Sequence, residues 1–162
     1  MEGDEEVASR NNHEAEVTTV VAAVIEREDR RLLIGQRRKG DTSALKWEFP
    51  GGKMRAGESP EAALARELRE ELGATVTKCV PIARVAHKYA YTAAELEIRF
   101  YAAEIAPREL VPAAFEQIAW ALPKELGDYD FLAANARLVA DLATGRIKPG
   151  EILREIESSK TG

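Results

Sequence analysis

The chain has little of what disulfide-bonded, zinc-binding and membrane proteins require. It contains one cysteine, Cys79, so no internal disulfide can form, and a reducing cytoplasmic compartment is expected. Its two histidines, His13 and His87, are too distant in sequence from each other to predict a zinc site. No apolar run is long enough to span a bilayer, and the acidic N-terminus lacks a signal-peptide pattern. The sequence therefore predicts no membrane partner.

The charge balance also limits the range of partners. A formal net charge of -5 argues against binding to a nucleic acid polymer, which requires clustered Lys and Arg. It does not exclude a small anionic substrate, because a bound metal can reverse the local field. Cys79 lies in the apolar-alternating run 76–80, where a small buried residue is the simpler interpretation than a catalytic thiol.

The length of 162 residues and 45% hydrophobic content are sufficient for one globular domain. We expect a disordered tail over 1–16, a domain over 17–145, and a terminal helix or tail over 146–162. The pattern is that of an α/β protein packed in layers. Strands are expected at 17–26 and 31–36 as a hairpin, then at 47–49, 75–87 with a break at Pro81, 95–104 and 118–122; a second helix is expected at 131–144.

Residues 60–72 carry strong helix signals at both ends. Ser59 is a favourable N-cap, Pro60 suits the first helical position, and Glu61 complements the positive end of the helix dipole. Gly73 is the expected left-handed terminator. We therefore expect a helix that begins after Ser59 and ends at Leu72.

This helix places like charges side by side next to its apolar stripe. At about 100° per residue, the buried stripe consists of leucines and the neighbouring arc of glutamates: Leu64, Leu68 and Leu72, then Glu67, Glu70 and Glu71. Stacked like charges cost an isolated helix a few tenths of a kcal/mol per pair. A solvated acidic edge is the simple interpretation. However, these carboxylates lie beside the core and shortly after a glycine-rich turn. This position favours ligation of Mg²⁺ or Mn²⁺.

A phosphate-binding P-loop is excluded by the residues after the glycine pair. Gly52 and Gly57 have the required spacing, but Glu58 and Ser59 follow them instead of Lys and Ser. A phosphate cradle that lacks its lysine and carries a carboxylate would repel its ligand.

The segment Gly52-x5-Glu58-x7-Arg66-Glu67-Leu68-x-Glu70-Glu71-x-Gly73-Ala74 resembles the Nudix box at every fixed position. The flanking segments 47–53 (WEFPGGK) and 32–38 (LLIGQRR) resemble the MutT branch of that family. The resemblance implies the Nudix fold, a mixed β-sheet sandwiched between helices. It also implies Mg²⁺-dependent hydrolysis at a phosphate chain, with Mn²⁺ as a possible substitute.

The resemblance assigns roles to the residues of the box. It implies metal ligation by Glu67, Glu70, Glu71 and the Gly51 carbonyl. Arg66 pairs with Glu58 to brace the loop against the helix, while Gly52 and Gly73 have structural roles. Glu67 is a candidate general base, and Glu116, shortly before Trp120, is another whose spacing departs from the MutT pattern.

Outside the box, four residues are candidate substrate contacts: Arg37, Lys53, Asn135 and Phe131. Arg37 aligns with an arginine that reaches the substrate, and Lys53 either contacts phosphate or is solvated. Asn135 aligns with an asparagine that reads an oxidised guanine, although an asparagine at a helix start is also a common N-cap. Phe131 could stack on a base together with Trp47, Tyr89 and Tyr91, or pack in the core.

Three functions remain open from the sequence. The first is a pyrophosphohydrolase of 8-oxo-dGTP or another non-canonical nucleotide, which removes it from the pool. The second is an enzyme of the same branch that cleaves CTP-type pyrimidine triphosphates. The third is a non-catalytic nucleotide-binding module, against which the intact acids argue. The sequence does not distinguish a monomer from a homodimer.

Overall fold

The computed structural model describes residues 17–88 and 95–161. The predicted disordered tail over 1–16, with His13, and the candidate stacking residues Tyr89 and Tyr91 lie outside these ranges. Within the described helices, none combines the length and apolar content that a membrane span requires.

Two sheets and three α-helices make up the described chain. The strands are β1 (Val17–Ile25), β2 (Leu32–Gln36), β3 (Trp47–Glu48), β4 (Gly51–Lys53), β5 (Val76–Lys88), β6 (Glu95–Ile105) and β7 (Gln117–Ala121). The helices are α2 (Pro60–Leu72), the 3-10 helices η1 (Pro123–Asp128) and η2 (Ala133–Asn135), α3 (Ala136–Ala143) and α4 (Pro149–Thr161). One sheet has the order β4-β1-β6-β5 and the other β3-β2-β7.

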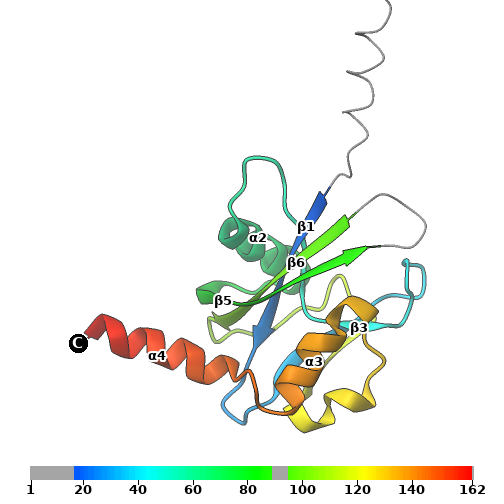
Figure 1. Cartoon of the computed structure of the whole chain (residues 1–162). Helices are drawn as coiled ribbons and strands as arrows, with labels where there is room; N and C mark the ends of the chain where they lie inside the picture. Colours follow the sequence, from blue (N-terminus) through cyan, green and yellow to red (C-terminus); the bar gives the residue numbers. More distant parts are fainter. Residues whose placement is uncertain (1–16, 89–94, 162) are drawn as a thin grey trace, which may run out of the picture.

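The four-stranded sheet lies between helices because its central strands are apolar on both faces. Alternate residues of β1 enter different cores: Val21 and Ala23 pack with α2, while Ala22 and Val24 pack with Leu138 of α3. Figure 1 shows α2 and α3 on opposite sides of β1 and β6. β1 runs parallel to β6 and antiparallel to β4. The predicted mixed sheet sandwiched between helices is confirmed.

The predicted hairpin of the first two strands is wrong. The turn is present, with the Arg27 amide donating to the Arg31 carbonyl at 2.8 Å, and Glu26 forms one bridge to Leu32. Beyond that bridge the strands separate. Both edges of β1 are occupied by β4 and β6, so β2 pairs with β3 and β7 instead.

Two further boundaries differ from the sequence prediction. Pro81 does not break β5, because this strand lies at the sheet edge and the proline is accommodated at a bulge between Pro81 and Ala83. Phe131 does not begin a helix but forms a bridge with Trp47; the chain then turns through η2 before α3. Leu138 and Leu142 of α3 are buried.

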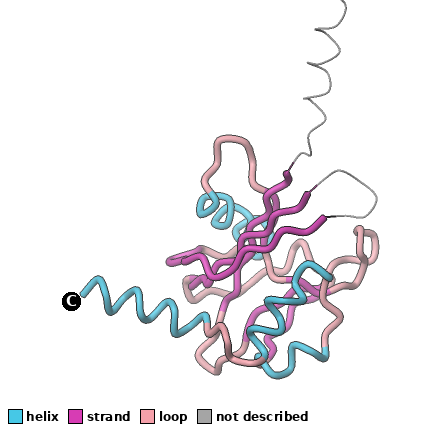
Figure 2. Tube along the Cα trace, in the orientation of Figure 1, coloured by secondary structure: helices cyan, strands magenta, loops and turns pink. Residues whose placement is uncertain are grey.

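Helix α2 begins and ends as predicted. The Ser59 hydroxyl accepts a hydrogen bond from the Ala62 amide at 3.1 Å. Gly73 adopts a left-handed conformation with φ of 65°, and its amide donates to the Arg69 carbonyl at 3.0 Å. At the other end of the chain, the terminal segment forms α4, which packs against β5 and β6 and projects from the rest of the molecule (Figure 2).

Candidate active site

Six of the predicted functional residues line a cleft of about 790 Å³: Arg37, Gly51, Gly52, Lys53, Glu71 and Asn135. Its floor is the face of the four-stranded sheet that presents Val20, Ala22, Leu96 and Ile98. Its sides come from the β2–β3 loop, residues 37–46, and from segment 132–135. Carboxylates and glycines gather at one end, whereas apolar side chains cover the floor; we call this space the central cleft.

Arg66 connects the acidic residues of α2 to the loop before the helix. Its Nε and Nη2 donate to the two carboxylate oxygens of Glu58, both at 2.8 Å, and its Nη2 also donates to the Lys53 carbonyl at 3.0 Å. Its Nη1 lies 2.8 Å from Glu67 and 3.4 Å from Glu70. The bidentate pair with Arg66 lowers the pKa of Glu58 to about 2. Arg66 therefore positions the carboxylates of Glu67 and Glu70 relative to Glu58.

Glu71, one turn after Glu67 on the same helix, extends into the glycine turn. Its carboxylate accepts a hydrogen bond from the Gly51 amide at 2.9 Å. Burial, together with the nearby charges of Glu48 and Glu67, raises the pKa of Glu71 to about 8. An acid held at this pKa marks the carboxylate end of the central cleft as a candidate site of chemistry.

The two glycines of the turn are required by close contacts. A Cβ on Gly51 would lie 1.9 Å from the Val21 carbonyl oxygen, a backbone atom that cannot move aside. A Cβ on Gly52 would lie 2.3 Å from the carboxyl carbon of Glu67. Glycine at these positions therefore lets the backbone approach β1 and the helix carboxylates closely.

Glu48 is a residue of the site that the sequence prediction missed. It lines the central cleft from β3, and burial raises its pKa. Arg37, the predicted substrate contact, lies 3.3 Å from the Glu48 carboxylate, and its Nε donates to the Thr42 carbonyl at 2.7 Å. The sequence signal that identifies Glu48 is its position as a single carboxylate between two aromatic residues, Trp47 and Phe49. Both aromatic side chains are buried in the structure.

The oxygen donors at this end suit a divalent cation. Carboxylates and a backbone carbonyl are the ligands that Mg²⁺ and Mn²⁺ prefer. Because Gly52 has no side chain, the Glu67 carboxylate lies directly against the glycine turn. In the described ranges, no three acidic, histidine or cysteine side chains converge into a metal cage. Each carboxylate is instead held by a protein donor, Glu67 and Glu70 by Arg66 and Glu71 by Gly51.

Asn135 lines the central cleft and is 4% exposed. It occupies the N-cap position of α3, but its side chain makes no capping hydrogen bond there. The capping interpretation of this residue is therefore wrong, and its amide remains available to the cleft. Lys53 also lines the cleft, with an exposed side chain.

Seven predicted residues do not line the cleft: Glu58, Arg66, Glu67 and Glu70, which are joined by the ion pairs of Arg66, and Phe131, Glu116 and Gly73. Phe131 stacks on Phe49, with ring centroids 5.4 Å apart, and Phe49 is the ring that faces the cleft. Glu116 is exposed on the β6–β7 connection, and the acids whose charges act on Glu71 are Glu48 and Glu67. Gly73 ends α2.

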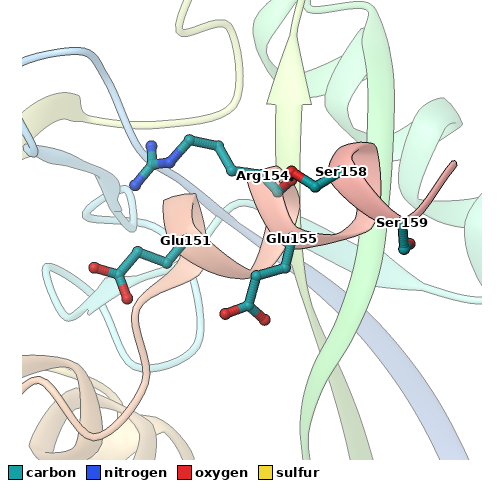
Figure 3. A pocket seen from close by; sticks show the side chains of 5 residues that line it. All are labelled: Glu151, Arg154, Glu155, Ser158 and Ser159. Carbon is teal, nitrogen blue, oxygen red and sulfur yellow. Dashed lines mark hydrogen bonds between the residues drawn. The ribbon is translucent and has the colours of Figure 1, made fainter. Parts of the chain in front are cut away.

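A second surface depression lies along α4 and has none of these properties. Figure 3 shows the polar side chains that line it, Glu151, Arg154, Glu155, Ser158 and Ser159, all from one helix. It has no apolar floor and no glycine turn. The central cleft is therefore the candidate active site.

Comparison with known proteins identifies the family of this arrangement. The NUDIX domain model matches residues 17–142. The chain is 33% identical to the CTP pyrophosphohydrolase of Escherichia coli over 141 residues, which covers 82% of this chain and 96% of that protein. It is 43% identical to the 8-oxo-dGTP diphosphatase of Proteus vulgaris over 70 residues, 43% of this chain and 62% of that protein.

Solved structures agree with the sequence relatives. A MutT structure from work on Aliivibrio salmonicida and Vibrio cholerae superposes with a TM-score of 0.68 at 29% identity, covering 80% of this chain and 99% of that one. Hydrolases of this family generally need a divalent metal, in agreement with the oxygen donors around Gly52. The chain belongs to the Nudix family and is a hydrolase of the MutT type.

Proposed function

We propose that this protein hydrolyses nucleoside triphosphates to a nucleoside monophosphate and pyrophosphate, and that 8-oxo-dGTP or another non-canonical nucleotide is its preferred substrate. The observation that carries the proposal is the position of Asn135, a buried amide in the same cleft as the Glu71 carboxylate of α2. An amide offers both a donor and an acceptor to the edge of a purine. The name of the Proteus vulgaris relative supports the oxidised guanine.

Different residues of the site have different roles in the proposed reaction. A bound Mg²⁺ ion, with Mn²⁺ as a substitute, would supply charge neutralisation on the phosphates and lower the pKa of an attacking water. Glu67, Glu70, Glu71 and the Gly51 carbonyl would hold it. Glu67, oriented by Arg66 at 2.8 Å, accepts the water proton as general base. Arg37 and Lys53 donate to phosphate oxygens of the substrate. These contacts orient the phosphorus atom that the water attacks.

A pyrimidine triphosphate is the second candidate substrate. The match to the CTP pyrophosphohydrolase extends over 96% of that protein, whereas the match to the Proteus enzyme is shorter. The same carboxylates would serve either reaction, and only the nucleoside end of the cleft would differ. A non-catalytic binding module is the least supported function, because every acid of the box is present.

The single cysteine supports a cytoplasmic location, and the net charge of -5 supports a free nucleotide over a polymer as partner. We propose that the protein acts there as a monomer or a homodimer. Light scattering on the full chain at several concentrations distinguishes these two states.

The deciding experiment measures pyrophosphate release with saturating Mg²⁺ from 8-oxo-dGTP, dGTP, CTP, 5-methyl-dCTP, ADP-ribose and a diadenosine polyphosphate. We expect the highest kcat/KM for 8-oxo-dGTP. A preference for CTP or 5-methyl-dCTP would establish the second candidate and leave the catalytic end as argued. Absence of turnover across the panel in folded protein would overturn the proposal.

A further inference from the structure

His87 lines the central cleft. The roles proposed above for the metal ligands and for Asn135 do not involve it. It lies near the end of β5, where half-buried and exposed side chains alternate from Arg84 to Lys88. His87 and Val85 occupy the half-buried face, and the His87 side chain lines the central cleft. Arg84 lies on the opposite, exposed face.

Cross-strand pairing shows where His87 lies relative to the phosphate end. Lys53 of β4 pairs with Val20, Val20 with Ile98, and Ile98 with Val85, so these four residues form one row across the sheet. His87 follows Val85 by two residues on the same face. Three strand spacings, about 14 Å, therefore separate the strand of Lys53 from the strand of His87. The two basic side chains lie at opposite edges of the cleft floor.

The surroundings of His87 differ from those of Lys53. The floor beside His87 is apolar, formed by Leu96, its direct partner on β6, and by Ile98. Carboxylates and glycines surround the Lys53 end. A flat aromatic side chain beside an apolar floor matches a heterocyclic base better than a phosphate.

We propose that His87 contacts the base of the bound nucleotide at the edge of the cleft farthest from the carboxylates, and that it contributes with Asn135 to base selection. This inference rests on the proposed function, since it assigns a role in base binding to another residue of the same cleft. Arg37 and Lys53 hold the phosphates and the carboxylates would hold the metal, whereas His87 and Asn135 distinguish one base from another.

Steady-state kinetics of His87→Ala, His87→Gln and the control Arg84→Ala test the role of the side chain. His87→Ala should lower kcat/KM about tenfold for the best substrate of the panel, through KM, because one hydrogen bond in a cleft is lost. It should also change the ratio of kcat/KM between purine and pyrimidine nucleotides. His87→Gln, which keeps a donor and an acceptor, should recover most of the loss. Arg84→Ala should behave as wild type, since its ion pair with Glu97 lies on the other face.

Calorimetric binding without turnover separates this inference from the proposed function. We expect His87→Ala to weaken binding of 8-oxo-dGMP and dCMP and to leave 2-deoxyribose 5-phosphate, which has no base, unchanged. Equal weakening for all three ligands, or none for any, overturns the inference even if the enzyme is active. If the protein shows no turnover but His87→Ala still weakens binding of only the two ligands that carry a base, the proposed function is overturned and this inference stands.

Discussion

Gly52 and Glu67 occupy one small space in the active site. A Cβ on Gly52 would lie 2.3 Å from the carboxyl carbon of Glu67 and 2.4 Å from one of its oxygens. On its other side the Glu67 carboxylate is held by Arg66 at 2.8 Å, which itself is bound to Glu58. The carboxylate therefore cannot retreat without breaking an ion pair of a largely buried arginine.

Gly52→Ala should consequently reduce kcat by at least about tenfold, equivalent to about 1.4 kcal/mol of transition-state stabilisation. The obstacle is the end of a flexible side chain, so the fold should survive with a small change in Tm. The measurement is kcat at saturating Mg²⁺ together with thermal unfolding. Gly40→Ala is the matched control, because a Cβ there meets no atom within 4 Å. Wild-type activity in Gly52→Ala would show that the position of Glu67 does not matter.

Glu70→Gln should remove most turnover without unfolding the protein. The Glu70 side chain is 51% exposed, so its loss should change stability by no more than about 0.5 kcal/mol. Removal of one carboxylate from a charge-stabilising site typically costs about 100-fold or more in kcat. Glu155→Gln, on the exposed face of α4, controls for the change in net charge. Full activity of Glu70→Gln at saturating Mg²⁺ would exclude Glu70 as a metal ligand.

Asn135→Ala should alter the ranking of substrates more than the maximal rate on simple triphosphates. Its side chain does not cap α3, so no helix cap is lost and the effect should be confined to the cleft. The measurement is kcat/KM over the nucleotide panel, with urea unfolding as the control for stability. An unchanged ranking would remove Asn135 from base recognition.

Metal-free protein should lose stability as the pH rises from about 4.5 to about 8. Glu71 has a folded-state pKa of about 8 against an ordinary value of 4.5, so in this window the folded protein keeps a proton that the unfolded chain releases. Burial raises the pKa of Glu48, which acts in the same direction. The lowered pKa of Glu58 matters only below 4.5, where stability falls as the pH falls.

Urea unfolding in EDTA between pH 5 and 8.5 measures this dependence. Glu71→Gln should flatten it, because the titrating carboxyl is gone. Mg²⁺ should stabilise the wild type most at the alkaline end, where the carboxylate is ionised and able to ligate. A slope that is the same in Glu71→Gln and wild type would assign the effect to other groups.

The sequence alone determined the features that depend on neighbouring residues. Ser59, Pro60 and Gly73 fix the ends of α2 through local hydrogen bonds and backbone conformation. Helical periodicity then placed the leucines in the core and the glutamates beside it. The pairing of Arg66 with Glu58 was predicted through the Nudix resemblance, and the two residues are joined at 2.8 Å.

Only the tertiary structure decided which distant residues share the cleft. The separation of β1 from β2 depends on which strands occupy the edges of β1, and no local signal carries that information. Strand pairing also places Glu48 of β3 near Glu71, and the pairing of β5 with β6 sets His87 on the cleft face of the sheet. Local propensities act over a few residues, whereas these contacts depend on sheet order and on burial. Helix ends and helix faces were therefore predictable, but the membership of the active site was not.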